Sequence, residues 1–353
     1  MQLTVDGKTV EAQKGQSLRE LVCGLGLDRE QLSQRPLAAR IAGEVFTLNY
    51  IPLRDKDGEG DRPSMRRAMA ASGGNIRLLR IKDSAGRDVY VRTGQFVVFL
   101  ALRQLWPEAV STMDCTLGSS AFISVTGAKD FSVSRLKAQV KQIVAQDIPL
   151  LRHRAKKEEA IARFAAEGQG DKARLLQWRS LEYCSEYSYG DYTDNFYGEM
   201  APSTGYLSVW DILPADGGFL FVYPDELEPD RPAKLSPMPQ FFSVFSEGER
   251  WCRLMDCENV ADLNELTASG KIRELIRVNE ALHEKRFSQV ADMVCSRGAK
   301  AVLLAGPSSS GKTTSAHRLA TQLRVYGKKP ILMSLDNYYI DRDKIAPGPD
   351  GKL

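Results

Sequence analysis

The residues with the clearest chemical potential form a glycine-rich stretch in the last quarter of the sequence. Gly306 is followed by four residues and then by Gly311, Lys312 and Thr313, in the spacing GxxxxGK[ST]. Glycines let the backbone turn tightly and direct several N–H groups at one anion. The lysine adds a positive charge, and the threonine hydroxyl suits a magnesium ion held between phosphate oxygens. The spacing therefore predicts a phosphate-binding loop for ATP and Mg²⁺.

The elements around this loop must hold it in place. An apolar run at 301–305 predicts a buried strand before the loop, and the pattern after Thr313 predicts a helix that ends near Tyr326. A strand, a glycine loop and a helix are the context that such a loop requires. We expect nine residues to contact the nucleotide, with Thr313 on the magnesium: Gly306, Pro307, Ser308, Ser309, Ser310, Gly311, Lys312, Thr313 and Thr314.

A second apolar run, at 331–335, predicts the next parallel strand, and Asp336 follows it. Ligands bind at the carboxyl ends of strands in open α/β sheets, so we expect Asp336 to face the phosphates. Lys312 and Asp336 are the candidate catalytic residues. The lysine would neutralise a transferring phosphoryl group while the carboxylate orients the attacking hydroxyl. The alternative is an aspartate that only caps a turn.

The segments GPSSSGKTT (306–314) and SLDNYY (334–339) together resemble the uridine kinase family. The resemblance implies ATP-dependent phosphoryl transfer to the 5′-hydroxyl of a nucleoside, a phosphotransferase reaction with an alcohol acceptor. It also implies that Asp336 takes the hydroxyl proton and that Tyr339 contacts the substrate. A P-loop kinase for another small hydroxyl-bearing substrate is an alternative.

The C-terminal segment is short for a complete kinase domain. Only 40 residues follow Thr313, and the final segment 347–353 has the composition of a loop. We therefore expect the first βαβ part of a P-loop nucleoside kinase, truncated within that domain. A nucleotide sheet of two strands cannot bury both of its faces, so we expect little or no turnover from this chain by itself.

The first 63 residues predict a small β-grasp, ubiquitin-like domain. Apolar and polar residues alternate around Asp6-Gly7, which predicts a hairpin, and a helix over 17–24 and a pair of strands over 38–48 follow. This order and the segment AARIAGEV (38–45) resemble the TGS domain of threonyl-tRNA synthetases and some GTPases.

The next segment predicts a polar linker over 63–74 and then a hairpin of two strands over 75–91. Helices are predicted over 95–105 and 132–146.

Residues 64–235 resemble the α+β editing-type domain of threonyl-tRNA synthetases. The resemblance rests on the segments LRQLWP (102–107), IVAQDIP (143–149) and APSTG (201–205). In that family the domain holds two pairs of metal ligands, histidines with one cysteine, four residues apart. The aligned positions here are Arg92, Phe96, Phe196 and Met200. None of these side chains supplies the neutral imidazole or thiolate that such a metal needs, so the resemblance implies shared architecture without deacylation.

Composition limits the class of protein. The chain has 353 residues, a formal net charge of +3 and no CxxC among its six cysteines, which is typical of a cytoplasmic multidomain protein with reduced thiols. No apolar run is long enough for a membrane helix, so no membrane partner is expected. Basic residues cluster at 62–92 and 151–157, where a solvated face is the usual meaning and RNA contact is the alternative.

The sequence thus predicts a multidomain α+β and α/β protein. Its parts are a TGS-like domain (1–63), an editing-like domain (64–235), a linker with a connecting helix (236–298) and the partial kinase domain (299–353). An alternative function is RNA binding or regulation, with tRNA or another RNA as the partner. It rests on the two synthetase-like domains and on the tyrosine-rich stretch 183–197, which could stack bases or simply pack. The oligomeric state is left open.

Overall fold

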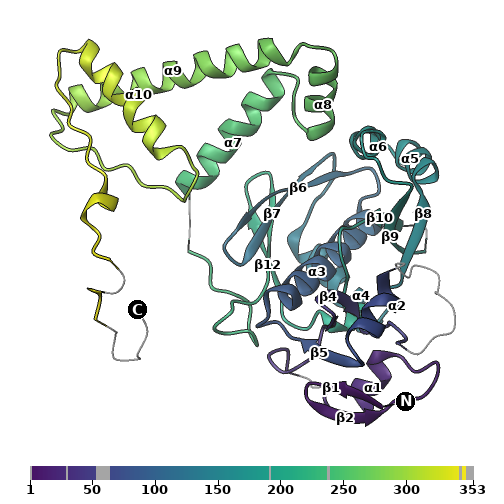
Figure 1. Cartoon of the computed structure of the whole chain (residues 1–353). Helices are drawn as coiled ribbons and strands as arrows, with labels where there is room; N and C mark the ends of the chain where they lie inside the picture. The colour runs from purple at the N-terminus through teal and green to yellow at the C-terminus, as the bar shows by residue number, and fades with distance from the viewer. Residues whose placement is uncertain are drawn as a thin grey trace. The chain divides into compact units, whose positions relative to one another are not determined.

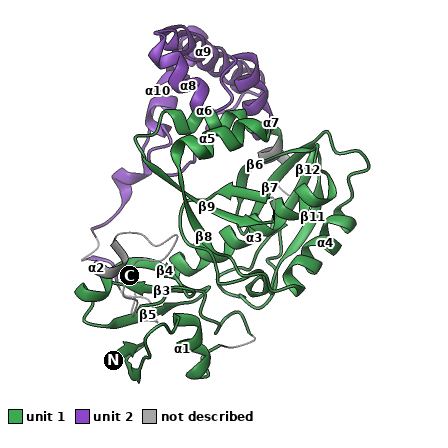
Figure 2. Cartoon of the chain, turned by 90° about the vertical axis from the view of Figure 1, so that its right-hand side faces the viewer, with its two compact units in different colours: residues 1–244 green, residues 245–353 purple. Residues whose placement is uncertain are grey.

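The computed structural model of this chain describes residues 2–28, 31–52, 64–190, 192–236, 239–341 and 344–346. Arg62 of the first basic cluster, the start of the expected linker at Pro63 and the expected loop at 347–353 lie outside these residues. The chain divides into two compact units, residues 1–244 and 245–353 (Figure 2).

A five-stranded sheet opens unit 1 (Figure 1). The strand order is β2-β1-β5-β3-β4, and β1 and β5 run parallel. The strands are β1 (Gln2–Val5), β2 (Lys8–Glu11), β3 (Ala38–Ile41), β4 (Glu44–Thr47) and β5 (Asn75–Leu79). Helix α1 (Leu18–Gly24) begins at a capping box in which Ser17 and Glu20 bond each other's backbone N–H groups. The hairpin, helix and strand pair predicted for this region are all present.

Strand β5 corrects the sequence prediction for 75–91. Residues 75–79 pair with β1 on one side and β3 on the other, and the chain then enters helix α3 (Ser84–Leu105) in place of a second hairpin arm. Gly86, in the first turn of α3, lies against the backbone of Arg80, where an added Cβ would sit 2.1 Å from the carbonyl oxygen. Glycine is required there for close approach, because any side chain would collide with the preceding turn.

The expected linker at 63–74 is also wrong in part, since Ser64–Ala71 form helix α2.

Helix α3 is the centre of the second half of unit 1. It is buried along most of its length, and at Gly94 an added Cβ would lie 2.4 Å from the ring of Phe221. A four-stranded sheet of order β11-β12-β7-β6 and a three-stranded sheet of order β10-β9-β8 belong to the same half. The elements are β6 (Val110–Leu117), β7 (Ser120–Thr126), α4 (Val133–Ala145), β8 (Arg152–Lys156), α5 (Lys157–Ala166), α6 (Gly170–Gln177), β9 (Tyr183–Tyr189), β10 (Tyr192–Asn195), η1 (Thr204–Tyr206), β11 (Asp211–Ala215) and β12 (Gly218–Val222).

Two of the segments that carry the synthetase resemblance meet each other in this half. Ile148 donates its N–H to the hydroxyl of Thr204 at 2.9 Å, and the N–H of Thr204 donates to the carbonyl of Ile148 at 2.9 Å. Asp147 adopts a left-handed φ of 45° and accepts hydrogen bonds from the Ser203 hydroxyl and the Gly205 N–H. The segments 143–149 and 201–205 therefore form one local structure.

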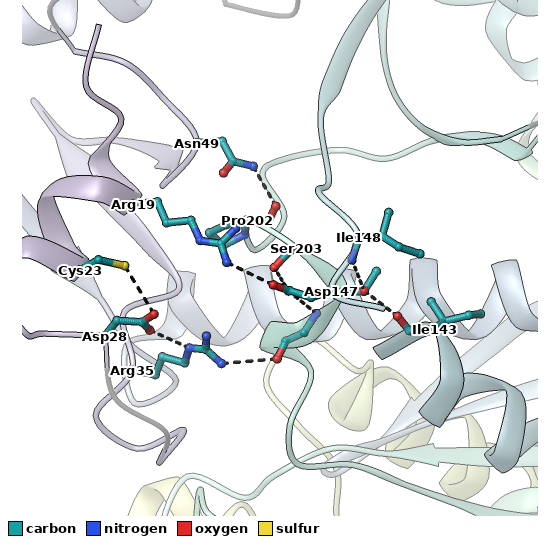
Figure 3. Close-up of polar contacts among 12 residues, drawn as sticks. Arg19, Cys23, Asp28, Arg35, Asn49, Ile143, Asp147, Ile148, Pro202 and Ser203 are labelled. Atoms are coloured by element: carbon teal, nitrogen blue, oxygen red, sulfur yellow. Dashed lines mark hydrogen bonds and ion pairs between the residues drawn. The ribbon is translucent and has the colours of Figure 1, made fainter. Parts of the chain in front are cut away.

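Polar contacts also connect the first sheet to this half of unit 1 (Figure 3). The Asn49 amide donates to the carbonyl of Pro202 at 2.9 Å, and Arg19 pairs with Asp147 at 3.4 Å. Arg35 pairs with Asp28 at 2.9 Å and lies over the ring of Tyr206, 3.8 Å from its centroid. Such contacts satisfy buried backbone carbonyls and explain why the two halves form one compact unit.

Unit 2 consists mainly of helices. Helix α7 (Pro239–Leu254) enters it, and α8 (Val260–Ala268), α9 (Ile272–Ser296), α10 (Lys312–Val325) and the short η2 (Leu335–Tyr338) follow. Helices α9 and α10 pack together, with Gln322 of α10 donating to the Glu284 carboxylate of α9 at 3.1 Å. No helix in the described part of the chain is both long and apolar enough to cross a membrane.

The strands predicted at 301–305 and 331–335 are not formed. Residues 301–305 and 331–334 have no regular secondary structure and Leu335 belongs to η2, while Leu303 is 96% exposed and Ile331 is 86% exposed. A parallel strand needs neighbours for its backbone hydrogen bonds and cover on both faces, and neither is present among the described residues of this unit. The mixed α+β architecture with several sheets is confirmed, whereas the first βαβ part of a kinase domain is not assembled.

Candidate functional site

The four positions aligned with the synthetase metal ligands come together in the structure. Arg92 and Phe96 lie one helical turn apart on α3, while Phe196 and Met200 follow β10. The rings of Phe96 and Phe196 are 5.9 Å apart in an edge-to-face arrangement, and Met200 is fully buried. The chain therefore brings these positions to one place, where three of the four side chains are apolar and the fourth is an arginine.

Phe96 is the centre of an aromatic cluster. Its ring lies 5.4 Å from that of Tyr192 and 6.5 Å from that of Tyr187. The Tyr187 hydroxyl donates to the carbonyl of Gly198 at 3.2 Å and accepts from the N–H of Met200 at 3.2 Å. Burial raises the pKa of both tyrosines well above the usual value, so their hydroxyls stay neutral. These tyrosines of the 183–197 stretch are packing residues.

Arg92 forms a hydrogen bond with the backbone at this position. Its Nη1 donates to the carbonyl of Glu199 at 2.5 Å, and burial lowers the pKa of its guanidinium. Gly198 has a φ of 112°, and a Cβ there would lie 2.9 Å from the Arg92 guanidinium carbon. Within the described ranges, no group of three His, Cys, Asp or Glu side chains is arranged to hold a metal ion.

Two ion pairs stiffen the adjacent three-stranded sheet. Arg152 of β8 pairs with the buried Glu199 at 2.9 Å, and Arg163 of α5 pairs with the buried Glu186 of β9. Burial raises the pKa of the Glu186 carboxyl, although the Arg163 guanidinium opposes that shift. Buried carboxylates persist when paired in this way, because the partner charge offsets part of their desolvation.

A pocket of about 270 Å³ opens beside the aromatic cluster. Residues from β8, from the segment after α6, from β9 and from the end of β10 line it, among them Arg152, Arg179, Tyr183, Asn195, Phe196 and Tyr197. Arg152 also donates to the Ser185 hydroxyl, while its Nε is buried without a hydrogen-bond partner. The pocket thus combines arginine side chains with aromatic walls.

Two arginines lie over exposed tyrosine rings around this pocket. Arg179 is 4.9 Å from the ring centroid of Tyr197 and donates to its hydroxyl at 3.1 Å. Arg154 is 4.5 Å from the ring centroid of Tyr183. Tyr197 is 59% exposed and Tyr183 is 37% exposed. A cation held over an exposed ring offers both a stacking surface for a base and a charge for a phosphate.

The predicted phosphate-binding residues lie in unit 2. Gly311 has a left-handed φ of 81° and immediately precedes α10, which begins at Lys312. The Lys312 ammonium donates to the carbonyls of Gly306 at 2.8 Å and Pro307 at 2.7 Å. Residues 306–311 are exposed, and the predicted helix follows them, whereas the strand predicted before them does not form.

The predicted catalytic pair is not brought together by a sheet. Asp336 lies in η2, where its carboxylate accepts a hydrogen bond from the Ser334 hydroxyl at 3.4 Å. Tyr339 follows that turn, 77% exposed. Both residues would stand at the carboxyl end of a strand over 331–335, and that strand does not form.

Comparison with known proteins gives relatives for most of this chain. The relatives are threonine–tRNA ligases. The one from Symbiobacterium thermophilum is 26% identical over 218 residues, which cover 61% of this chain and 30% of that protein. Those from Acetivibrio thermocellus (26% over 220 residues) and Clostridium kluyveri (22% over 218 residues) are matched over 61% of this chain and 31% of their own length. The chain therefore spans about a third of these relatives. No protein-family model matches it.

These relatives contradict the nucleoside-kinase prediction, both as the function and as the enzyme class. Their name is that of a tRNA ligase, and nothing in the comparison supports a uridine kinase or a nucleoside substrate. The alternative interpretation, a protein built on tRNA-synthetase-like parts, agrees better with them.

Sequence reasoning missed part of the candidate site. The sequence shows the basic cluster 151–157 and the tyrosine-rich stretch 183–197, but no pattern in it singles out Arg179. Its position just after α6 carried no motif, and only the fold shows that it reaches Tyr197.

Proposed function

We propose that this protein binds RNA of the tRNA class through unit 1 and does not deacylate it. The relatives are named for a tRNA substrate, which supports tRNA as the class of RNA. The observation that carries the proposal is the pocket lined by Arg152, Arg179, Tyr183 and Tyr197, in which Arg179 lies over the exposed ring of Tyr197. Arg154, which does not line the pocket, lies over the ring of Tyr183.

The chemistry of the pocket suits an unpaired nucleotide. An unstacked base gains contact area on a tyrosine face, and base–aromatic stacking tolerates any base. Phosphates on either side of that base would pair with the guanidinium groups, whose planar donors match phosphate oxygens. The net charge of +3 is small, so attraction to RNA depends on this local group of cations more than on the whole surface.

The aromatic cluster at Phe96 and Phe196 explains why hydrolysis is not part of the proposal. A hydrolytic metal centre needs imidazole, thiolate or carboxylate ligands and room for a water molecule. Two phenylalanine rings and the buried Met200 occupy the equivalent place.

A titration of the full chain with tRNA at low and at moderate salt tests the proposal. Saturable binding that weakens as salt rises is expected, because phosphate contacts release counterions. An aminoacylated tRNA should bind, and its ester bond should hydrolyse no faster than it does in buffer alone. Absence of binding at low salt would remove the proposal.

We also propose that 306–314 bind the phosphates of ATP together with Mg²⁺. The supporting observation is the left-handed Gly311 directly before α10, which leaves the first N–H groups of a 14-residue helix exposed beside Lys312. Lys312 would leave the two carbonyls that it now contacts and pair with phosphate oxygens, and Thr313 would hold the metal. When bound, magnesium would neutralise phosphate charge.

A further inference from the structure

The turn after α7 places two cysteines at the two ends of one hydrogen-bonded motif. The N–H of Cys257 donates to the carbonyl of Cys252 at 3.1 Å, and the N–H of Asp256 donates to the carbonyl of Arg253 at 3.1 Å. Asp256 is left-handed, with a φ of 49°. These two hydrogen bonds around a left-handed residue define a Schellman motif, in which the side chains at the two ends commonly touch.

The hydrogen bond limits the separation of the two residues. A carbonyl oxygen lies about 2.4 Å and an amide nitrogen about 1.5 Å from its own Cα, so this bond of 3.1 Å holds the Cα atoms of Cys252 and Cys257 within about 7 Å. Disulfides span Cα separations up to nearly that value. The thiols are also electrostatically coupled: Cys252 contributes to the raised pKa of Cys257, after burial and the Asp262 carboxylate.

Four other helices end in the same motif and provide an internal comparison. In each of them the left-handed residue is a glycine, and the residue whose carbonyl accepts the longer-range hydrogen bond is apolar or aromatic. The residues at the two ends of that bond are Val22 with Leu27, Phe164 with Gln169, Val294 with Ala299 and Leu323 with Lys328. At the end of α7 the left-handed residue is an aspartate, and both end positions carry sulfur. Two cysteines could simply be small apolar residues in contact, so the experiment must separate packing from chemistry.

We propose that Cys252 and Cys257 are a redox-active pair that closes to a disulfide on contact with a small-molecule disulfide. Cys252 is exposed and Cys257 is partly exposed, so a small oxidant can reach them. The turn between α7 and α8 (Figure 1) is the part of unit 2 that the bond would fix.

The exchange balances without any other reactant. The Cys252 thiol loses its proton and attacks one sulfur of the small disulfide, which releases one small thiol and leaves a mixed disulfide on Cys252. Cys257 then loses its proton and attacks Cys252 sulfur, which releases the second small thiol. Two protein thiols are oxidised, and one small disulfide is reduced to two thiols. Cys252 attacks first because burial and Asp262 raise the pKa of the Cys257 thiol.

Oxidised glutathione and peptide mapping test the proposal on the full chain. Trypsin cleaves after Arg250 and Arg253, so the two cysteines fall on different peptides, 251–253 and 254–271. A covalently linked pair of these peptides, lighter than their sum by two hydrogen atoms and separated by a reductant, is expected from the wild-type chain. In Cys257→Ser a glutathione adduct should remain on Cys252. Cys295→Ser, which removes a thiol at the end of α9, should leave the linked pair unchanged.

A second variant tests the role of the turn. Asp256→Gly removes the strain of a left-handed aspartate, so the linked pair should form at least as fast as in wild type. When the wild-type chain is unfolded in guanidinium chloride, the disulfide should form about tenfold more slowly, because the turn no longer holds the two thiols together. Unmodified thiols at both positions, separate adducts on both, or a bond from either to another cysteine would each overturn the proposal.

Discussion

The guanidinium of Arg179 lies 4.9 Å from the ring centroid of Tyr197, and its Nη1 donates to the tyrosine hydroxyl at 3.1 Å. Both residues line the pocket beside the aromatic cluster, and Tyr197 leaves more than half of its surface open to solvent. An arginine that contacts both the face and the hydroxyl of a tyrosine restricts that ring before any ligand arrives. A base that stacks on Tyr197 therefore meets a surface that is already ordered, which lowers the entropy lost on binding.

Replacing Tyr197 by alanine should weaken tRNA binding by roughly 5-fold to 100-fold, the range expected for loss of one base–aromatic stack. Fluorescence anisotropy with labelled tRNA measures the dissociation constant. Tyr197→Phe keeps the ring and should bind nearly as well as wild type. Tyr338→Ala removes an exposed tyrosine of unit 2 and is the matched control. Equal affinity of wild type and Tyr197→Ala would show that this ring does not contact RNA.

Replacing Phe96 by alanine should lower the free energy of unfolding by about 3–5 kcal/mol, because the fully buried ring contacts three other aromatic rings. Urea unfolding monitored by tyrosine and tryptophan fluorescence gives the value. Phe96→Leu leaves a smaller cavity and should cost less than the alanine variant. A loss below about 1 kcal/mol for Phe96→Ala would mean that the cluster is not packed as described.

Glu186 should make stability depend on pH. Burial raises the pKa of its carboxyl above the usual 4.5, so the folded chain holds this proton more tightly than the unfolded chain. The contribution of Glu186 to the free energy of unfolding therefore falls as pH rises from 4.5 through the raised folded-state pKa. Glu186→Gln removes this titration, and the difference between wild type and variant isolates it.

The measurement is urea unfolding of both proteins at several values between about pH 4 and about pH 8. The stability of wild type relative to Glu186→Gln should decrease as pH rises through that window. A relative stability that stays constant, or that increases with pH, is inconsistent with a carboxyl whose pKa burial has raised.

Lys312→Ala should weaken ATP binding by at least about tenfold, because the phosphate loop loses its only long cationic side chain between 306 and 314. Isothermal titration with ATP and Mg²⁺ measures the affinity. Lys328→Ala, an exposed lysine just beyond α10, is the control and should bind as wild type does. Unchanged affinity in Lys312→Ala would remove the nucleotide proposal and leave the RNA proposal intact.

The sequence was sufficient where local rules decide the structure. Ser17 and Glu20 have the spacing of a capping box, and α1 begins there. The stripe of Leu136, Val140 and Ile143 predicts the buried face of α4, and all three side chains are buried. The helix predicted after the glycine-rich segment is also present as α10, directly after the left-handed Gly311.

The sequence alone does not predict the structure where contacts between distant segments determine it. The alternation over 75–91 fits a hairpin as well as a strand followed by a helix, and only pairing with β1 and β3 selects the second. The apolar run 301–305 reads as a strand, but an apolar segment becomes a strand only beside a partner. At the candidate site, Arg179 and Tyr197 are 18 residues apart and no motif links them.

The salt dependence of tRNA binding is the most direct measurement of the central claim. Arg179→Gln should weaken binding and reduce the slope of log affinity against log salt by about one, because one phosphate contact is lost. Arg231→Gln, an exposed arginine that pairs with Glu228 away from the pocket, should leave the slope unchanged. An equal slope for wild type and Arg179→Gln, or no saturable binding of tRNA by wild type, would contradict the proposed RNA site.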